Sequence, residues 1–565
     1  MKKEIDCLII GHNNMPLVEY EKDVQKMGVN SGAYRDLNLN FIRFNNKPLH
    51  LSDFFNRFCG GYFRGKESFK SLNMFDTFSA TIAYLGTYLN RRGFTFDYVL
   101  SFQDEKQTLA EKLEKENIRT IAITTTYYVS VLPILEIVAF IKNHNRSAKI
   151  IVGGPFVSTK VRCLNDPLLI GHLFESSIGA DFYVNSSQGE TALVEIINAL
   201  NNNLSFAGID NIYYKVDGGR GYAATPVKPE NNRLSENMVD WDLFVHNVGE
   251  YADLRTSISC PFSCAFCGFP EHAGKYQTTD VDAIEQELKR LDKITSLKGV
   301  KFIDDTFNVP PTRYKNILRM MIRNKYKFKW IGNFRCQFAD REMVELMKES
   351  GCEAVYLGIE SGSDEILKNM NKQVTVDDYL RGIALLKEYD IMTFGSFIVG
   401  FPGETDETVR ETIQFIEKSG IEFFRANLWY CEHITPIWKK REKYQIKGDG
   451  FEWSHGTMDS KRAADLVEQL FLTIKNPIWV PIYNFEMDSL WHLLHRGMTI
   501  DRVKKLLIAF NDGIKEKLKA PSIREVPFDI IKQVKECCRV GEGAVDFEYD
   551  QSEGQDRYRV EFDLD

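Results

Sequence analysis

The stretch Cys260-Pro261-Phe262-Ser263-Cys264-Ala265-Phe266-Cys267-Gly268 places three cysteines within eight positions, and the rest of the chain is interpreted from it. Thiolates are ligands of iron–sulfur clusters, and three of them on one short loop can bind three irons of a 4Fe-4S cluster while the fourth iron stays open. An open iron can chelate a small molecule. The spacing also permits a zinc site with His272 as the fourth ligand.

Around this motif, apolar strands alternate with helices. Strands are expected at 254–258, 299–303, 330–334, 354–357, 393–398 and 423–428, and helices at 281–291, 313–324, 342–350, 376–388 and 404–419. The cysteine motif directly follows the first of these strands. Six such units predict a parallel sheet in the form of a partial (β/α)6 barrel, whose site lies at the carboxyl ends of the strands.

Polar residues stand at three of these strand ends. They are Asp304 and Asp305 after the second strand, Asn333 and Arg335 after the third, and Glu360 and Ser361 after the fourth. Either aspartate can accept a hydrogen bond from an ammonium group. Each residue taken alone also suits a helix cap or a solvated strand end. Their placement at successive strand ends favours one shared binding site.

With an aromatic residue before the last cysteine and a position at a barrel mouth, the CxxxCxxC loop resembles that of the radical S-adenosylmethionine (SAM) family. The resemblance implies that SAM binds the open iron and is cleaved to a 5'-deoxyadenosyl radical. It implies contacts of Asp304 or Asp305 with the SAM amino group, of Glu360 and Ser361 with its ribose or carboxylate, and of 395–404 with adenine. It also implies an electron donor such as flavodoxin or ferredoxin.

Residues 1 to about 205 predict a separate doubly wound α/β domain. Its strands are expected at 5–10, 96–100, 120–124, 149–152 and 180–184, alternating with helices. The strand ends carry Thr124, Thr125, Thr126, Gly153, Gly154, Gly189 and Glu190. This pattern resembles the cobalamin-binding domain found upstream of radical SAM barrels, which implies bound cobalamin. Glycines let a backbone approach a ligand closely, and hydroxyls pair with its polar groups. Without the barrel, an ordinary flavodoxin-like domain would fit equally.

The loop after the first strand departs from one family pattern. Families in which a histidine ligates the lower face of cobalt carry the motif Asp-x-His-x-x-Gly. In this chain the residue two positions before His12 is Ile10, so the aspartate that would orient the imidazole is missing. We therefore expect His12 to be a polar loop residue rather than a cobalt ligand. A cobalt without a lower nitrogen ligand, which the resemblance implies for some relatives, favours methyl transfer.

The other segments are less regular. An extension at about 15–76 interrupts the first domain, and a hairpin and linker are expected at 206–245. The barrel is expected at 246–458, followed at 459–565 by a mainly helical region that ends in a hairpin. The extension resembles sequences near phosphinate P-methyltransferases. Arg35, Arg43, Arg57 and Arg64 in it are suited either to an anionic substrate or to structural pairing.

Composition excludes several classes of function. The 565 residues carry a net charge of -8 without a basic tract, so nucleic acid is not the expected partner. There is no apolar run of roughly 20 residues and no secretory leader, which indicates a cytoplasmic protein without membrane spans. Eleven cysteines in a chain of this length do not form a disulfide framework.

These patterns leave three hypotheses for the function. The first is a methyltransferase that moves a methyl group from SAM through cobalamin to an unactivated carbon or phosphorus of a metabolite or peptide. The second keeps both cofactors but performs a radical rearrangement, cyclisation or ring contraction. The third is a non-catalytic cobalamin-binding regulator, against which the intact cysteine motif argues. The sequence does not identify the substrate.

Overall fold

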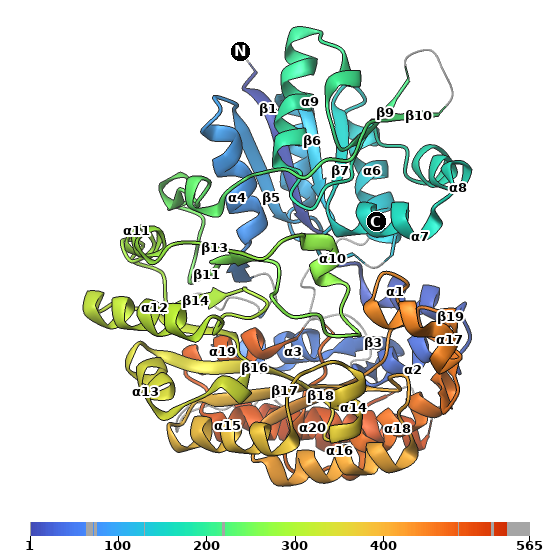
Figure 1. Cartoon of the computed structure of the whole chain (residues 1–565), viewed down its shortest axis with the longest axis vertical. Helices are drawn as coiled ribbons and strands as arrows, with labels where there is room; N and C mark the ends of the chain where they lie inside the picture. Colours follow the sequence, from blue (N-terminus) through green and yellow to red (C-terminus); the bar gives the residue numbers. More distant parts are fainter. Residues whose placement is uncertain are drawn as a thin grey trace.

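Two mainly parallel sheets organise the chain, and the first stands with its strand ends towards the second (Figure 1). The computed structural model describes residues 2–63, 72, 76–128, 130–216, 221–483, 485–520 and 525–538. The α/β class predicted from the sequence is confirmed, with one doubly wound sheet, one sheet of barrel type and a helical region after it.

The first sheet has the strand order of a doubly wound nucleotide-binding fold. Its parallel strands run in the order β5 (Phe96–Ser101), β1 (Glu4–His12), β6 (Asn117–Thr124), β7 (Lys149–Gly153) and β8 (Phe182–Val184). The expected hairpin, β9 (Ile212–Lys215) and β10 (Tyr222–Ala224), extends this sheet in antiparallel fashion beside β8. From β1 the chain first leads to β5 on one side and then to β6 on the other side, so the topological switch point lies between β1 and β6. In such sheets a ligand binds at the carboxyl ends of the strands beside this switch point.

Alternating side chains of β1 enter two different cores, as the period of a strand requires. Cys7 and Ile9 belong to the core under α4 (Ala80–Asn90) and α9 (Glu190–Asn202). Leu8 and Ile10 belong to the core under α5 (Lys106–Lys115) and α6 (Leu132–His144). The strand is therefore apolar throughout because helices cover both faces of the sheet.

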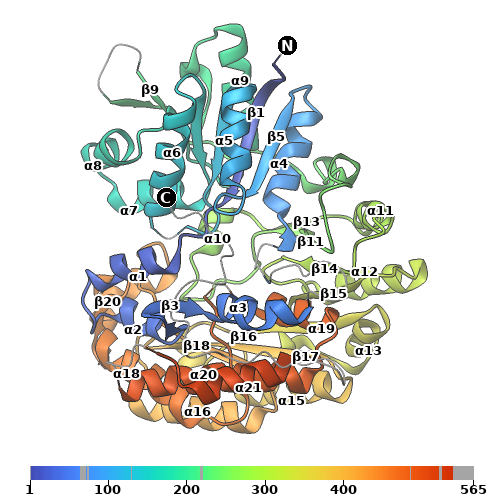
Figure 2. The ribbon, with the colours of Figure 1, turned by 180° about the vertical axis from the view of Figure 1, so that it is seen from behind.

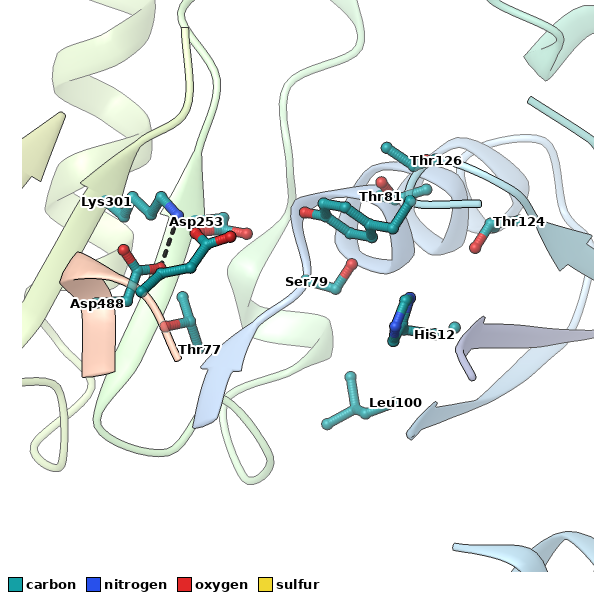
Figure 3. Close-up of a pocket in the computed structure, with 13 residues that line it drawn as sticks. His12, Thr77, Ser79, Thr81, Leu100, Thr124, Thr126, Asp253, Lys301 and Asp488 are labelled. Carbon is teal, nitrogen blue, oxygen red and sulfur yellow. Dashed lines mark hydrogen bonds and ion pairs between the residues drawn. The ribbon is translucent and has the colours of Figure 1, made fainter. Parts of the chain in front are cut away.

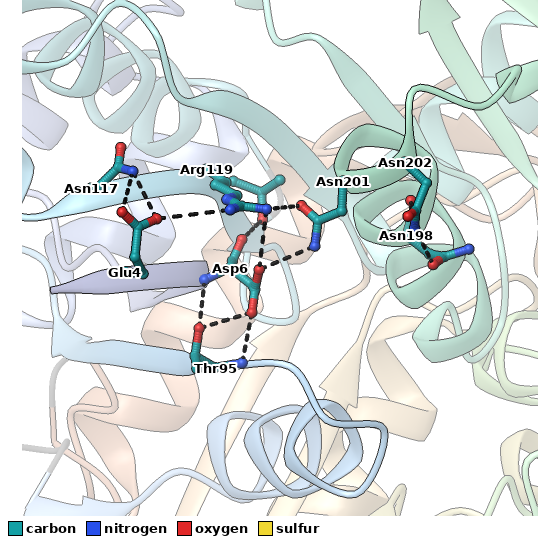
Figure 4. A network of polar contacts seen from close by, with 9 residues as sticks. Glu4, Asp6, Thr95, Asn117, Arg119, Asn198, Asn201 and Asn202 are labelled. Carbon is teal, nitrogen blue, oxygen red and sulfur yellow. Dashed lines mark hydrogen bonds and ion pairs between the residues drawn. The ribbon is translucent and has the colours of Figure 1, made fainter.

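A network of polar contacts joins the strands of this sheet at their amino-terminal ends (Figure 4). The reversal of the connections concerns the opposite, carboxyl-terminal ends of β1 and β6. The carboxylate of Asp6 accepts hydrogen bonds from the Thr95 amide at 2.9 Å and from Asn201 Nδ2 at 3.1 Å. Glu4 accepts from Asn117 Nδ2 at 2.7 Å. This edge is satisfied internally, which leaves the opposite edge for ligands.

The second sheet contains the six predicted barrel strands and one more at each edge. All neighbours are parallel, in the order β4 (Thr77–Phe78), β11 (Tyr251–Leu254), β14 (Gly299–Phe302), β15 (Lys329–Asn333), β16 (Cys352–Glu360), β17 (Met392–Val399), β18 (Phe423–Leu428) and β22 (Ile478–Trp479). The first strand was expected at 254–258, which is wrong by about three residues. Ser257–Ile258 instead forms β12, which pairs antiparallel with β13 (Gln277–Thr278). Thr77–Phe78, just before α4, forms the edge strand β4, which the sequence pattern did not predict.

The expected helices follow the barrel strands as α11 (Val281–Leu291), α12 (Pro311–Asn324), α13 (Arg341–Glu349), α15 (Val376–Glu388) and α16 (Asp406–Ser419). A further helix, α19 (Met487–His495), packs directly on the sheet. The Trp491 ring lies where a side chain at Gly299 would be, with Cη2 2.0 Å from the position of a Cβ atom. The His492 ring stacks on Tyr251 at a centroid distance of 3.8 Å. This helix therefore fills part of the face of β11 and β14 next to it.

The extension lies with the second sheet and not with the first. It consists of α1 (Leu17–Gln25), α2 (Gly32–Asn38), β2 (Phe41–Phe44), β3 (Lys47–His50) and α3 (Leu51–Phe63). Figure 2 shows it beside the C-terminal helices α18 (Ser460–Thr473), α20 (Ile500–Lys519) and α21 (Phe528–Cys538). Arg425 on β18 pairs with Asp36 at 3.0 Å, and Lys517 Nζ donates to the Asn38 carbonyl at 2.7 Å. The terminal hairpin expected after 538 lies outside the described residues. Among the described helices, none has the length and apolarity needed to cross a bilayer.

Candidate functional site

The three cysteines lie on one loop between β12 and α10 (Phe269–Ala273). Cys264 is buried, while Cys260 and Cys267 are half-buried. The Cys267 amide donates to the Cys264 carbonyl at 3.1 Å, and the Ala265 amide donates to the Met370 carbonyl at 2.7 Å. The loop is thereby fixed to the segment that follows β16.

This loop fits an iron–sulfur cluster better than a zinc ion. Burial, followed by the charges of the nearby Cys264 and Cys260 thiolates, raises the pKa of Cys267 to about 12, so a bound cation is needed to hold all three as thiolates. In the described ranges no three His, Cys, Asp or Glu side chains converge as a single metal ion requires. A 4Fe-4S cluster instead takes each thiolate on a different iron. His272, the fourth ligand of the zinc alternative, has its Nε2 atom 3.2 Å from Thr159 Oγ1 on α7 (Pro155–Leu164).

Arg335 places a buried cation beside this loop. Its Cζ atom is 3.7 Å from the ring centroid of Phe262, and its Nη2 atom is 3.5 Å from Cys264 Sγ. Nη1 is buried and has no hydrogen-bond partner among the described residues. A buried guanidinium with an unused N–H group fits an anionic neighbour, such as a thiolate-bound cluster or the carboxylate of SAM.

The two adjacent aspartates after β14 have different environments. Asp304 is buried, and its Oδ1 atom accepts from the amides of Thr256 at 2.7 Å and Ser257 at 2.6 Å. It therefore fastens the segment that leads to Cys260. The Asp305 side chain is accessible to solvent, but the surrounding protein partly desolvates its carboxylate, and this desolvation, followed by the charge of Asp304, raises its pKa to about 7. Of the two aspartates, Asp305 is the one whose carboxylate is left for a SAM amino group.

Asn333, Glu360 and Ser361 are also held by protein contacts. Asn333 Nδ2 donates to the Asp304 carbonyl at 2.9 Å. Glu360 is buried with a backbone φ of 69° and pairs with Lys372 Nζ at 3.0 Å. Ser361 Oγ accepts from the Ser363 amide at 3.2 Å. The predicted residues thus cluster around the barrel mouth, where Glu360 and Lys372 form a buried ion pair that the sequence pattern did not indicate.

In the first domain, the threonines and the Gly153–Gly154 pair come together at the ends of β6 and β7. Thr125 Oγ1 donates to the Gly153 carbonyl at 2.9 Å, and Thr124 Oγ1 donates to the Ile10 carbonyl at 3.3 Å. Gly154 has a φ of 112°, and a Cβ atom there would lie 2.8 Å from Thr125 Oγ1. Only glycine fits this backbone, because φ is positive and Thr125 occupies the space of a side chain. The close approach of a ligand to Gly154 stays a prediction.

Gly189 and Glu190, at the start of α9, are held by the linker. The linker residue Glu230 accepts hydrogen bonds from the Gly189 amide at 3.1 Å and the Thr191 amide at 2.8 Å, and so caps α9. Glu190 is buried and accepts from Asn232 Nδ2 at 3.2 Å. The end of α9 is therefore occupied by the linker, a contact that sequence reasoning missed because Glu230 stands in a polar segment without periodicity.

His12 ends β1 at the switch between β1 and β6. Its ring contacts the rings of Tyr127 and Tyr128, with both centroid distances 5.4 Å. Burial lowers the pKa of His12 to about 4, so the imidazole is neutral at physiological pH. The expectation that His12 is not a cobalt ligand stays a prediction.

A cavity of about 80 Å³ joins the two domains at this point (Figure 3). From the first domain it is lined by Gly11, His12, Leu100, Thr124, Thr126 and Tyr127. From the second sheet and the elements around it come Thr77, Ser79, Thr81, Asp253, Lys301, Glu486 and Asp488. The switch point of one sheet therefore opens onto charged side chains of the other.

Comparison with known families matches both halves of this arrangement. Residues 254–416 match the Radical SAM superfamily, and residues 74–167 match the B12 binding domain. With the CxxxCxxC loop at a barrel mouth, the chain is a radical SAM enzyme. Because a B12 binding domain precedes the barrel, it is more particularly a cobalamin-dependent radical SAM enzyme. The expected cofactors, a 4Fe-4S cluster, SAM and cobalamin, are confirmed by this assignment.

Relatives of known sequence or structure extend the likeness. An uncharacterized methyltransferase of Pyrococcus horikoshii is 26% identical over 60% of this chain and 72% of its own length. An anaerobic magnesium-protoporphyrin IX monomethyl ester cyclase of Rubrivivax gelatinosus is 23% identical over 66% of this chain and 67% of its own. The solved structure of the radical SAM methyltransferase TsrM from Kitasatospora setae is similar with a TM-score of 0.53, at 20% identity, over 65% of this chain and 74% of its own. The last comparison supports the fold alone.

Proposed function

We propose that this chain is a methyltransferase that moves a methyl group from SAM through cobalamin to an unactivated carbon or phosphorus of a small molecule or peptide. The observation that carries the proposal is the cavity shared by both domains, which His12 and Thr124 line from one side and Asp253 and Lys301 from the other. When bound, cobalamin would carry the methyl group, while SAM on the cluster would supply the radical that activates the acceptor. The methyltransferase relative from Pyrococcus horikoshii supports the same reaction.

The protein residues would act by binding and positioning. Cys260, Cys264 and Cys267 would hold the cluster, and Arg335 would compensate the charge beside it. Asp305 would meet the SAM amino group. The remaining barrel residues proposed for SAM are Asp304, Asn333, Glu360 and Ser361, of which Asp304 acts through the loop before Cys260.

On the side of the first domain, Thr124, Thr125, Thr126, Gly153 and Gly154 would bind cobalamin. Gly189 and Glu190 would do so only indirectly, through the capped end of α9. A reduced flavodoxin or ferredoxin in the cytoplasm would supply the electron that the radical chemistry needs.

A radical cyclisation or rearrangement is the second candidate, because one relative is a cyclase. Anaerobic, reconstituted enzyme supplied with reductant and methyl-labelled SAM separates the two. Methyl transfer predicts both S-adenosylhomocysteine and 5'-deoxyadenosine as products, whereas cyclisation predicts 5'-deoxyadenosine alone. A Cys264→Ala variant is the control, since it should lose the cluster and form no 5'-deoxyadenosine.

A phosphinate acceptor, suggested by the extension, would need an anion site. Arg35 of the extension is paired with Glu468 at 3.1 Å, Arg43 with Glu21, and the Arg57 guanidinium lies 4.8 Å from the Phe44 ring centroid. Arg64 lies outside the described residues. The three described arginines thus have partners within the protein, which favours a structural role for them over substrate binding.

A further inference from the structure

The charged side of the shared cavity is built from two neighbouring barrel strands and the start of α19. Asp253 on β11 and Lys301 on β14 are directly opposite each other in the register of the two strands. Glu486 precedes the first turn of α19, and Asp488 lies in it. Figure 3 shows the side chains of Asp253, Lys301 and Asp488 turned towards one another, with Thr77 nearby. Three carboxyl groups therefore surround one ammonium group.

Lys301 is already matched by one of these carboxylates. Its Nζ atom is 2.6 Å from Asp488 Oδ2, and the Tyr356 hydroxyl donates to Asp488 Oδ1 at 3.1 Å. Asp488 thus has partners on both oxygens, and Lys301 has its counter-ion. The pair Lys301–Asp488 is neutral as a unit, so Asp253 and Glu486 determine the remaining charge.

Asp253 is only partly satisfied, because the Ala80 backbone hydrogen-bonds to its carboxyl group but one of its two oxygens is left without a donor. Only 9% of its surface is exposed, and its Oδ1 atom has no hydrogen-bond partner among the described residues. Burial and the neighbouring Asp488 raise the pKa of Asp253 to about 7, although Lys301 opposes the shift. A buried carboxyl oxygen without a donor is costly to a folded protein, and a ligand with an N–H donor would remove that cost.

The sign of the charges selects the class of ligand. An anion would have to compete with Asp488 for Lys301 while facing Asp253 and Glu486. A cation instead meets Asp253 and Glu486, neither of which forms an ion pair with a described residue, and it would favour the ionised form of both more strongly than the more distant charge of Lys301 does. The cavity volume of about 80 Å³ suits the end of a small molecule better than a whole cofactor.

We propose that this cavity is the substrate site and that it accepts a small-molecule amine in its ammonium form, with Asp253 as the main acceptor opposite the Lys301–Asp488 pair. This inference rests on the proposed function, because it takes the shared cavity as the place of reaction. The rest of the substrate would extend from Asp253 towards the first domain, where it would face the cobalamin that we assign to Thr124 and Thr126.

Calorimetric titration of the anaerobic holoenzyme with three matched probes tests the proposal. Butylammonium is expected to bind, whereas 1-butanol and butyrate are expected to bind at least about tenfold more weakly, since a hydrogen bond to a charged group is lost. Asp253→Asn should weaken butylammonium binding by about the same factor. The matched control Glu417→Gln removes an exposed acid on α16 and should leave binding unchanged.

Two outcomes would overturn the site. One is that butyrate binds to the wild-type protein as tightly as butylammonium does. This outcome can be measured even if the Asp253→Asn variant does not fold. The other is butylammonium binding that is the same in Asp253→Asn as in the wild type. Product analysis separates this inference from the proposed function. If label is transferred to an acceptor without an amine, the inference fails alone, whereas if butylammonium binds at Asp253 but no label leaves SAM, the methyltransferase proposal fails alone.

Discussion

Replacement of Asp304 by alanine should release the cysteine loop, while the adjacent Asp305→Ala should not. Asp304 Oδ1 accepts from the amides of both Thr256 and Ser257, at 2.7 and 2.6 Å, and from Ser257 Oγ at 2.9 Å. From the part of the chain that the structure describes, Oδ2 accepts only from Thr256 Oγ1. All of these bonds are buried and lie just before Cys260 in the chain.

The expected cost follows from the donors that lose their acceptor. Each buried amide left without a partner costs about 1–3 kcal/mol, so the two amides together cost about 2–6 kcal/mol, while the two hydroxyls can turn to other acceptors. Asp304→Asn keeps an oxygen in the position of Oδ1, and its amide nitrogen can donate to the Thr256 hydroxyl. We therefore expect the asparagine variant to lose only about 1 kcal/mol.

Iron and sulfide content after anaerobic reconstitution, with hydrogen exchange of residues 256–260, measures the effect. Asp304→Ala should bind less iron and exchange faster across this segment, and Asp304→Asn should stay close to the wild type. Asp305→Ala should keep its cluster but bind SAM about tenfold more weakly, because one charge-assisted hydrogen bond is lost. A full cluster and unchanged exchange in Asp304→Ala would refute the reasoning, as would a loss in Asp304→Asn equal to that in the alanine variant.

Three further substitutions test other parts of the structure. Lys372→Met should leave Glu360 buried and unpaired, and should lower the free energy of unfolding by about 3–5 kcal/mol. Adding Glu360→Leu should restore much of this loss. Thermal unfolding of the single and double variants measures the coupling between the two residues. Gly154→Ala should cost about 1–3 kcal/mol and reduce cobalamin retention after gel filtration, whereas Gly171→Ala, with no atom within 4 Å of its Cβ position, should not reduce it. Because the pKa of Asp253 is raised from 3.8 to about 7, the folded state binds this proton more tightly than the unfolded state, and stability is lost as pH rises between these values. Relative to the wild type, Asp253→Asn should therefore gain up to about 4 kcal/mol between pH 4 and pH 8, and a difference that does not change with pH would contradict this assignment.

The sequence predicted the barrel well because its strands are short apolar runs between clear helices. The error at the first strand has a local cause. Thr256 and Ser257 look like part of a strand in sequence, but Asp304 binds their amides, and Ser259 turns the chain with a φ of 67°. Such contacts join residues about fifty positions apart and leave no trace in the periodicity.

The edge strand β4 was unpredictable for a related reason. Thr77 and Phe78 become a strand only by pairing with Tyr251 and Ala252. A two-residue strand has no alternation of its own, so its conformation depends on its partner. The same pairing brings the extension beside the barrel, although the extension lies within the first domain in the sequence.

For the candidate site, the sequence predicted which residues belong to it more readily than the role of each residue. The sequence identified both Asp304 and Asp305 but could not tell which one faces a ligand, because loop residues do not obey a strand's alternation. Asp253 and Lys301 were missed, although the segment Tyr-Ala-Asp-Leu carries a charged residue inside an otherwise apolar strand. The signal present in the sequence was a charged residue within each of two adjacent strands, which in a barrel is unfavourable unless the charges are used.

The position of α19 explains why these charges are used at the cavity and not elsewhere. Trp491 and His492 cover β11 and β14 from the amino-terminal side, against Gly299 and Tyr251. Only the next inward positions on the two strands, those of Asp253 and Lys301, remain to line the cavity. The C-terminal region therefore does more than cover the sheet, because by filling one part of its face it leaves a small charged space directly opposite the switch point of the first domain.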